Sequence, residues 1–568
     1  MANPKNIKGK PSPNRGGQKT PVYSSAARPS TLFERLNKWF DGRANILTIV
    51  ILSLSFLFSL LLFQARMDIG GDDSAYLERA FNFVHKGEFP IFQGPLYPLV
   101  LSMFVAPFGI NIVLLKFLSI VFNIVGLWFF YKAFYKRLPS FVFYPVFFIA
   151  AINSYILNFA SLTYNEAFFT MLQYIFFFIF FKLIDSGETT DLAGNIKESF
   201  KLWLPSGLLI FMLILTRNIA FVCLGGLVLY LVINKQYKHV LYLVGAFLVF
   251  QLPMMALEKT VFHVQNQWQS QGELLLLKNP YNKAEGYENF SGFVNRFFEN
   301  CGIYLSKRFM QIIGFRSADS TDSIGGITFI LASVILLSFY RIIKSGNKYL
   351  LAVCLYTVSI LAGTFFSLQT RWDQPRMVMV YVPLLLMILF YGLYDLFKKM
   401  WAGQLVLLLL ILSVGIAGIA NTLNKTKKNM PIISKNMHGD MLAGYTPDWV
   451  NYLKASKWCA DSLPKGSLVL ARKSAMSFIY SNGTEFFPIY NQFSNNADTI
   501  LDFYKKNNVT YILAAQIRLN PDVNDGNFIN TIQQTFGYVS QKYPKKLKFI
   551  HQEGTSESAQ VWQIMYNN

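Results

Sequence analysis

RMDIGGDDSAYLERAFNFVHKGEFPIFQGPLYP, residues 66–98, is a polar segment between two apolar segments. Apolar runs of about 20 residues can cross a lipid bilayer as helices, and such runs recur along most of the chain. Residues 66–98 are therefore predicted to leave a membrane and return to it. The segment contains adjacent carboxylates, Asp72 and Asp73, directly after Gly70 and Gly71. Two acids on a glycine-flanked loop at a membrane surface indicate a catalytic centre on the non-cytoplasmic side.

The composition is typical of a membrane protein. Of the 568 residues, 53% are hydrophobic and 16% aromatic, whereas only 15% are charged. These fractions lie outside the range of ordinary soluble domains. The net charge of +21 is explained by basic cytoplasmic loops and a basic N-terminal arm. The basic residues are spread over many loops, which disfavours nucleic acid as a partner.

The predicted fold class is a polytopic α-helical membrane protein with about 11 transmembrane helices. Every loop that alternation places in the cytoplasm carries Lys or Arg, which supports this register. The apolar segment 96–108 is short for a span, so it is predicted to re-enter or to lie in the interface. The predicted spans are 46–63, 111–131, 141–157, 167–181, 203–215, 219–233, 240–257, 324–340, 349–366, 377–397 and 405–420.

Three parts follow from this pattern. Residues 1–44 are rich in Lys, Pro, Gly and Ser and are predicted to be a disordered cytoplasmic arm. Residues 45–420 form the transmembrane domain, with outer loops at 64–95 and 258–323. Residues 421–568 contain no spanning run and are predicted to be a soluble extracytoplasmic α/β domain. Its predicted elements are a helix opened by Thr446-Pro447-Asp448, strands at 468–471 and 511–515, a helix at 497–506 and a hairpin of 549–551 and 560–565.

The spacing of apolar residues predicts a helix over 73–86. Asp72 and Asp73 lie at its N-terminal end, where the helix dipole favours an ionised carboxylate. One of them is predicted to act as the general base that deprotonates an acceptor hydroxyl or amine during attack. The alternative is structural, with one carboxylate as helix cap and the other as a solvated loop acid.

Glu166 lies at the outer end of an apolar span. Ionisable residues at membrane depth are costly and usually functional, so Glu166 is predicted to orient the acceptor or a loop partner. A cap for the helix that follows is the alternative reading.

Arg217, Arg371 and Arg376 are predicted at the outer ends of spans, where basic residues are disfavoured. Because Arg binds phosphate in a bidentate manner, an anionic lipid phosphate would explain them. The alternatives are contact with lipid headgroups or an ion pair such as that of Asp373 with Arg376.

The remaining reactive side chains give no further motif. Cys301 and Cys459 fall in outer segments and are able to form a disulfide, whereas Cys223 and Cys354 fit as packing residues. The sequence has no HExxH, P-loop, CxxC or GxSxG motif, and its His residues lack metal-ligand spacing. No cofactor and no metal site are predicted, and a divalent metal has no support in the sequence.

Four stretches together resemble the C superfamily of glycosyltransferases (GT-C), in the branch of protein O-mannosyltransferases and the lipid A aminoarabinose transferase. They are GDDSAYLERA at 71–80, GEFPIFQGPLYPLVL at 87–101, SLTYNEAFF at 161–169 and LTRNIAF at 215–221. The likeness covers residues 45–420.

The resemblance implies an inverting glycosyltransferase of the cell envelope. Its donor would be a sugar on a polyprenyl phosphate, and its acceptor a lipid, glycan or protein on the outer face of a bacterial inner membrane. Asp72 matches the catalytic acid by its spacing to Tyr76, and Tyr76 and Tyr97 would contact substrate. The aminoarabinose-type pattern has Glu-Lys where this chain has Gln93-Gly94, so another cation must bind the phosphate.

Two other functions stay open. A non-enzymatic lipid-linked sugar flippase or transporter would place polar residues in mid-span and repeat broken helices in two halves. A polysaccharide polymerase or ligase with a pyrophosphate donor would concentrate basic residues in one large outer loop. The acids of this chain lie in outer loops between apolar spans, which favours the enzyme; the loop 258–323 is large but of mixed charge.

Overall fold

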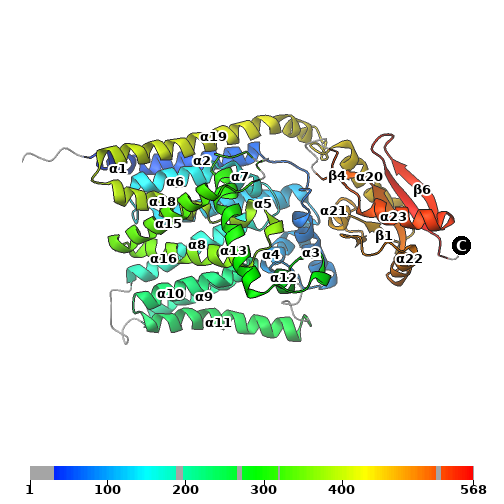
Figure 1. Cartoon of the computed structure of the whole chain (residues 1–568), viewed down its shortest axis with the longest axis horizontal. Coiled ribbons are helices and arrows are strands. Elements are labelled where there is room, and N and C mark those ends of the chain that lie inside the picture. The colour runs from blue at the N-terminus through cyan, green and yellow to red at the C-terminus, as the bar shows by residue number, and fades with distance from the viewer. Residues whose placement is uncertain are drawn as a thin grey trace, which may run out of the picture.

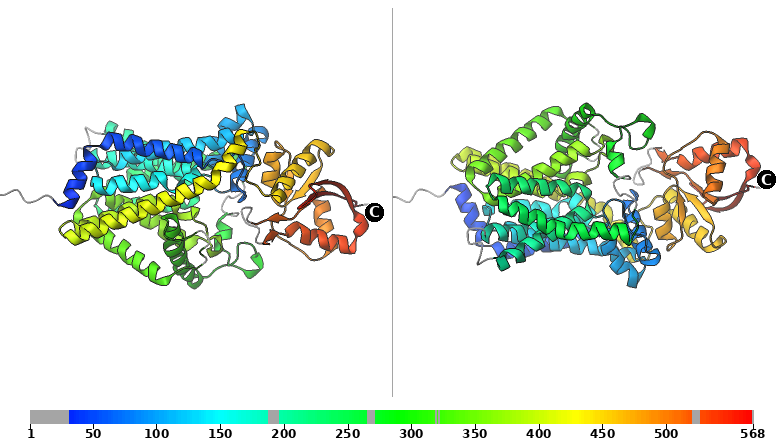
Figure 2. Two further views of the ribbon diagram at one scale, coloured as in Figure 1. Left: turned by 90° about the horizontal axis from the view of Figure 1, so that it is seen from above. Right: turned by 90° about the horizontal axis from the view of Figure 1, so that it is seen from below.

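The computed structural model describes residues 31–186, 196–264, 271–317, 320, 322–519 and 526–566. A bundle of helices forms most of the molecule, and a smaller domain with a β-sheet lies at one end of it (Figures 1 and 2). This agrees with the predicted division into a helical membrane domain and a C-terminal α/β domain.

The bundle contains the helices expected of an integral membrane protein. Among the described residues, seven helices are long and apolar enough to cross a membrane, and a pair bent by 52° would make an eighth. The seven are α2 (Ala44–Leu61), α5 (Ile112–Phe134), α8 (Glu166–Ser186), α11 (Tyr237–Thr260), α15 (Gly325–Ser345), α16 (Lys348–Ser367) and α19 (Trp401–Met437); the bent pair is α6 (Ser140–Ile152) and α7 (Ser154–Ala160).

Three further predicted spans are shorter apolar helices. They are α9 (Ile196–Thr216), α10 (Phe221–Ile233) after the turn η1 (Asn218–Ala220), and α18 (Val382–Phe397). Their apolar parts are 10–17 residues long, which is less than the thickness of a bilayer requires of an untilted helix. Each of the eleven predicted segments therefore falls on helix, but the number of eleven spans stays a prediction.

The N-terminal arm is shorter than predicted. Residues Leu32–Asp41 form helix α1, which begins with a capping box in which the Thr31 side chain accepts from the Glu34 backbone and the Glu34 side chain accepts from the Thr31 backbone. Phe33 is 1% exposed and stacks on Phe141. The prediction of disorder through residue 44 is therefore wrong from residue 32 on, and residues 1–30 lie outside the described part.

The boundary of the C-terminal domain also differs from the prediction. Helix α19 continues 17 residues beyond the predicted end of the last span at 420, to Met437. Its polar side chains in this part bind neighbouring backbone: Thr422 Oγ1 donates to Ile152 O (2.6 Å), and Asn429 Nδ2 donates to Leu61 O (3.0 Å). The composition turns polar at residue 421 because the helix there supports the outer ends of other helices. Figure 1 shows α19 along the whole bundle, reaching the C-terminal domain.

The C-terminal domain has a five-stranded mixed sheet with the order β2-β1-β3-β7-β6. Strand β1 is parallel to β2 and β3, and β7 is antiparallel to β3 and β6. The predicted strands, helices and hairpin are all present. The strands are β1 (Leu468–Ala471), β2 (Phe486–Pro488), β3 (Val509–Ala515), β6 (Leu547–Glu553), β7 (Ala559–Ile564) and the separate pair β4 (Ile517–Arg518) and β5 (Phe528–Ile529); the helices are α20 (Pro447–Ser462), α21 (Ser474–Tyr480), α22 (Ala497–Lys506), α23 (Thr531–Lys542) and η6 (Pro544–Lys546).

The loops that are predicted to lie outside form short helices between the bundle and this domain. The first loop carries α3 (Asp72–Lys86) and is followed by α4 (Leu96–Phe108), and the two helices pack together. Helix α21 packs on α3 through the rings of Phe478 and Phe81, whose centroids are 5.3 Å apart. The other outer elements are α12 (Gln271–Leu276), η3 (Lys283–Glu285), α13 (Phe290–Cys301), η4 (Gly302–Phe309), α14 (Met310–Ile312), η5 (Thr370–Trp372) and α17 (Arg376–Met379).

All four cysteines are free. Cys301 is partly exposed and Cys459 is buried in α20, so the disulfide considered for this pair is not formed. Cys223 and Cys354 are buried in α10 and α16, as expected of packing residues.

The predicted topology places the N-terminus in the cytoplasm and residues 421–568 outside it. A fluorescent protein that matures only in the cytoplasm should therefore be dark when it is fused after Asn568. The matched control is the same protein inserted after Gly346, in the predicted cytoplasmic loop between α15 and α16, which should fluoresce. Fluorescence of the fusion after Asn568 in whole cells would contradict the topology.

Candidate functional site

Four charged side chains meet at the end of the bundle that contacts the C-terminal domain. Asp72 begins α3, Glu166 begins α8, Arg217 follows α9 and Arg376 begins α17. The Arg376 guanidinium forms an ion pair with Asp72, and its Nη1 lies 3.9 Å from Glu166 Oε1. Arg217 Nη1 lies 3.6 Å from the same oxygen. Segments up to 304 positions apart in the sequence thus bring together four of the residues that the sequence singled out.

Asp72 is the most accessible of the acids in this cluster, with a side chain that is 29% exposed. Helix α3 begins after Gly71, whose φ is +90° and which provides no side-chain cap. Because Gly71 is the N-cap residue, Asp72 lies in the first turn of α3. Its carboxylate contacts Arg376. The alternative that Asp72 only caps the helix therefore does not describe this structure.

Asp73 is placed differently from its neighbour. Its side chain is fully buried, and its carboxylate accepts from the backbone N–H groups of Asp68 (2.7 Å) and Ser74 (2.7 Å). Burial, and next the carboxylate of Asp68, raise the pKa of Asp73 to about 7. Both oxygens of Asp73 are engaged by backbone, so this residue fixes the loop before α3 and leaves Asp72 as the accessible carboxylate.

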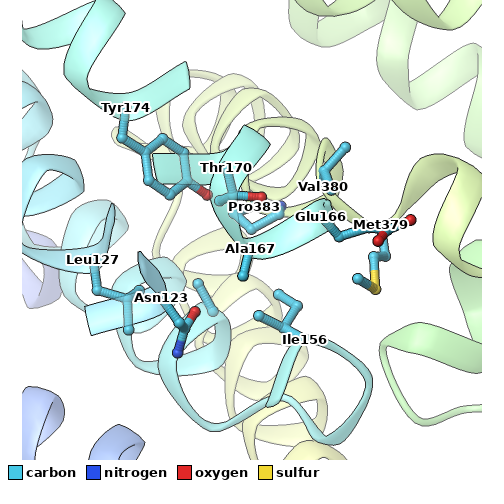
Figure 3. Close-up of a pocket in the computed structure, with 11 residues that line it drawn as sticks. Asn123, Leu127, Ile156, Glu166, Ala167, Thr170, Tyr174, Met379, Val380 and Pro383 are labelled. Atoms are coloured by element: carbon cyan, nitrogen blue, oxygen red, sulfur yellow. The ribbon is translucent and has the colours of Figure 1, made fainter. Parts of the chain in front are cut away.

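Glu166 lies close to both arginines, Arg217 and Arg376. Its side chain is 2% exposed, and Oε2 has no hydrogen-bond partner among the described residues. Figure 3 shows Glu166 at a small pocket lined mostly by apolar side chains, with Asn123, Thr170 and Tyr174 as further polar residues. A carboxylate in this position holds Arg217 and Arg376 close to each other. No group of three or more His, Cys, Asp or Glu side chains that would suit a metal ion occurs in the described part of the chain.

Arg376 is held as a cation by this arrangement. Burial works against its charge, but Asp72 and Glu166 outweigh burial and raise the pKa of Arg376 above its usual value. The ion pair of Asp373 with Arg376 that the sequence suggested is wrong, because Asp373 pairs with Lys307 and Arg308 of η4. These two cations hold the segment between η5 and α17 and leave Arg376 to the carboxylates of the cluster.

Arg217 has an unused hydrogen-bonding group. Its side chain is 13% exposed, and its buried Nη1 has no hydrogen-bond partner in the described ranges. Gly94 lies against the end of α9 that carries this residue: a Cβ at position 94 would lie 2.4 Å from Thr216 O. Gly94 occupies the position at which the resemblance implied a lysine. Because glycine has no side chain, the loop can approach the end of α9, which carries Arg217.

Tyr76 and Tyr97 are buried beside the cluster. Their rings pack edge to face at 5.3 Å. Tyr76 Oη accepts from Asn165 Nδ2 (2.9 Å), and the hydroxyls of Tyr97 and Ser119 are 3.4 Å apart. The two tyrosines thus position α3, α4 and the start of α8, and their predicted contact with substrate stays a prediction.

Arg371 is separate from the other arginines. It lies exposed in η5, and the described residues offer it no ion pair with Asp72 or Glu166. Its predicted role at a lipid phosphate stays a prediction, and no contact with the cluster of Asp72, Glu166, Arg217 and Arg376 supports it among the described residues.

Comparison of structures finds archaeal oligosaccharyltransferase from Archaeoglobus fulgidus. The complex of AglB with an inhibitory peptide and a dolichol-phosphate matches with a TM-score of 0.54 and 12% identity, over 93% of this chain and 75% of that chain. The apo form matches with a TM-score of 0.52 and 12% identity, over 82% and 69%. No protein-family model and no curated protein matches the sequence.

The chain therefore shares the fold of these oligosaccharyltransferase structures. This confirms the fold that the four sequence stretches implied. At this level of identity the likeness concerns the fold alone, and the branch within GT-C stays a prediction.

The sequence analysis did not identify the residues that hold the loop before α3. Tyr164 Oη donates to Asp68 Oδ2 (2.6 Å), and Lys116 Nζ donates to Gln64 O and Arg66 O (2.5 Å each). Lys116 is fully buried in α5, and a lysine within an apolar span was a signal that could have found it. Lys473 of the C-terminal domain also donates to this loop, at Ile69 O (2.6 Å), and no local pattern links it to the site.

Gly94→Ala should destabilise the protein more than Gly87→Ala. Both glycines have positive φ, +92° and +70°, so both variants share a backbone cost of about 1–3 kcal/mol. Only at position 94 does the new Cβ overlap with backbone, and such overpacking costs about a further 1–3 kcal/mol. Melting temperatures of the purified chains in detergent measure the difference. Equal shifts for the two variants would contradict the close contact with α9.

Proposed function

We propose that the chain is a glycosyltransferase that moves a sugar from a polyprenyl-phosphate donor to a lipid, glycan or protein acceptor on the outer face of the membrane. The observation that carries the proposal is an accessible carboxylate, Asp72, that pairs with Arg376, while Glu166 holds Arg217 near the same arginine. A base and a phosphate-binding cation are the two functions that such a transfer needs from a protein. The AglB structure of the comparison holds a dolichol-phosphate, which is a lipid phosphate of the proposed class.

In this proposal Arg217 and Arg376 bind the phosphate of the donor. Arg217 Nη1 lacks a hydrogen-bond partner in the described chain, and Glu166 holds both guanidinium groups in place. Guanidinium groups bind phosphate oxygens through strong, charge-assisted hydrogen bonds. A phosphate here would compete with Asp72 for Arg376, so binding of the donor would free the Asp72 carboxylate for the acceptor.

Asp72 would act as the general base. It accepts the proton of the acceptor hydroxyl or amine while that group forms a bond to the anomeric carbon of the sugar. The bond between this carbon and the phosphate oxygen breaks at the same time, with inversion. The leaving polyprenyl phosphate carries the developing negative charge, which Arg217 and Arg376 stabilise. Glu166 and Asp73 would act indirectly, since one holds the arginines and the other holds the loop.

The position of the site in the cell belongs to the same proposal. The predicted topology puts α3 and the C-terminal domain outside the cytoplasm, and a bacterial inner membrane is the proposed location. Apolar helices support an integral membrane protein.

Asp72→Asn should lower the rate of sugar transfer by about 10²–10⁴-fold, the usual contribution of a general base. The amide keeps the size of the side chain but removes the charge that pairs with Arg376, so the melting temperature should fall. Donor binding should not weaken, because Asp72 no longer competes with the phosphate for Arg376. Asp73→Asn is the matched control because it changes the adjacent acid in the same way. It loses one backbone hydrogen bond of a buried group, so it should lower stability by about 1–3 kcal/mol and the rate by less than Asp72→Asn does.

The assay is transfer from a polyprenyl-phosphate sugar in liposomes, with donor binding measured on the same samples. Normal transfer by Asp72→Asn together with an inactive Asp73→Asn would move the base to Asp73. Normal transfer by both variants would remove this loop from the chemistry. Movement of the intact donor across the bilayer by the wild type, without transfer, would favour a flippase.

A further inference from the structure

The connection between β1 and α21 brings two basic residues of the C-terminal domain to the site. Lys473 Nζ donates to Ile69 O (2.6 Å) and lies 3.8 Å from the place of a Cβ on Gly71. Gly71 directly precedes Asp72, so a cation of the C-terminal domain lies next to the proposed base. Figure 1 shows α21 beside α3, in agreement with their packing.

Arg472 lies on the same connection, and none of the described carboxylates forms an ion pair with it. Its buried Nε has no hydrogen-bond partner in the described residues, and its guanidinium lies over the ring of Tyr490 at 5.6 Å. Burial lowers the pKa of Arg472, and the nearby hydroxyls of Tyr452, Tyr490 and Tyr281 act in the opposite direction. Tyr281 belongs to the second outer loop, so Arg472 lies where the C-terminal domain meets the outer loops of the bundle.

The two cations are unfavourable neighbours in the absence of an anion. Burial, and next the charge of Arg472, lower the pKa of Lys473 to about 8. The carboxylates of Asp68, Asp72 and Asp73 oppose this shift, but no ion pair joins Lys473 or Arg472 to a carboxylate within the described ranges. Partly buried like charges side by side, one of them with an unused N–H group, are suited to bind an anionic ligand.

Exposed aromatic side chains flank this pair. Tyr490 is 58% exposed and Tyr281 60% exposed. Trp372 of η5 donates from Nε1 to Tyr281 Oη (3.0 Å), which ties the aromatic group to the segment that leads to Arg376. Tyrosine and arginine are both enriched at binding surfaces. Tyrosine offers contact area at low cost in conformational entropy, and arginine offers charged hydrogen bonds.

We propose that Arg472 and Lys473 form an anion-binding site through which the C-terminal domain holds a phosphate or similar acidic group of a substrate next to Asp72. The domain would then complete the active site. The site itself is independent of the proposed function, whereas the identity of the anion rests on that function: it belongs either to the acceptor or to the donor.

Binding of inorganic phosphate to the full chain in detergent tests the site without any need for transfer. A ligand that binds the folded state raises the melting temperature in a saturable way, and potassium chloride at equal ionic strength provides the reference. Arg472→Gln with Lys473→Gln should weaken phosphate binding at least tenfold, since two charged hydrogen bonds are lost. The matched control is Lys505→Gln with Lys506→Gln, an exposed adjacent pair at the end of α22, which should bind as the wild type does.

Arg472→Gln alone keeps the bond from Lys473 to the first outer loop, so it tests the site even if the double variant is unstable. It should weaken phosphate binding by about half as much on a logarithmic scale. Unchanged phosphate affinity in both variants would overturn the proposal. So would phosphate binding that Arg217→Gln abolishes and that the two variants leave intact, because the anion would then bind only at the proposed donor site.

Transfer assays identify the source of the anion. A rise in the KM of the acceptor of about threefold in Arg472→Gln, with kcat and donor KM unchanged, assigns the anion to the acceptor. The same rise in the donor KM alone assigns it to the donor phosphate. If the Arg472 and Lys473 variants bind phosphate more weakly than the wild type, but the wild type transfers no sugar, the anion site is supported and the proposed function is contradicted. Failure of the site and failure of the proposed function can therefore be told apart.

Discussion

The pairing of Arg376 with two carboxylates is the interaction on which the candidate site depends. Arg376 contacts Asp72 and lies near Glu166, whose other neighbour is Arg217. Largely buried charges are tolerated only when they are paired, and removal of one partner typically costs about 3–5 kcal/mol. The starts of α3, α8 and α17 and the end of α9 must therefore meet. The same constraint places an accessible carboxylate and two cations within one small region, and these are the groups that the proposed sugar transfer needs.

The loop before α3 connects this cluster with the rest of the protein. Tyr164 and Lys116 bind it from the membrane domain, and Lys473 binds it from the C-terminal domain. Asp73 closes it from within through two backbone hydrogen bonds. Hydrogen bonds from three directions fix the backbone of this loop, so Asp72 starts from a defined position. The C-terminal domain is thus part of the support of the site and not a separate appendage.

Residue patterns at the ends of helices made the starts of several elements predictable. Adjacent acids after two glycines identified the start of α3, and Pro447 after Thr446 identified the start of α20. The predicted end of the last span at residue 420 was wrong, because the change to polar residues there has another cause. The polar residues after position 420 hold the outer ends of other helices through Thr422 and Asn429 and do not end α19.

The sequence predicted which residues belong to the candidate site, but it did not predict which of them form ion pairs with each other. Positive-inside statistics selected Arg217, Arg371 and Arg376 alike, but only tertiary contacts separate Arg371 from the other two. Asp373 was a reasonable partner for Arg376 by its spacing in the sequence. Lys307 and Arg308, 66 and 65 positions away, bind it instead, and no sequence pattern reports contacts over such separations.

A structure of the full chain with a bound polyprenyl phosphate sugar is the most direct test of the central claim. The account predicts that the phosphate lies within hydrogen-bonding distance, about 2.7–3.2 Å, of the guanidinium groups of Arg217 and Arg376, with the anomeric carbon facing Asp72. A phosphate bound at Arg371 or at another surface, with Asp72 still paired to Arg376 and remote from the sugar, would contradict it.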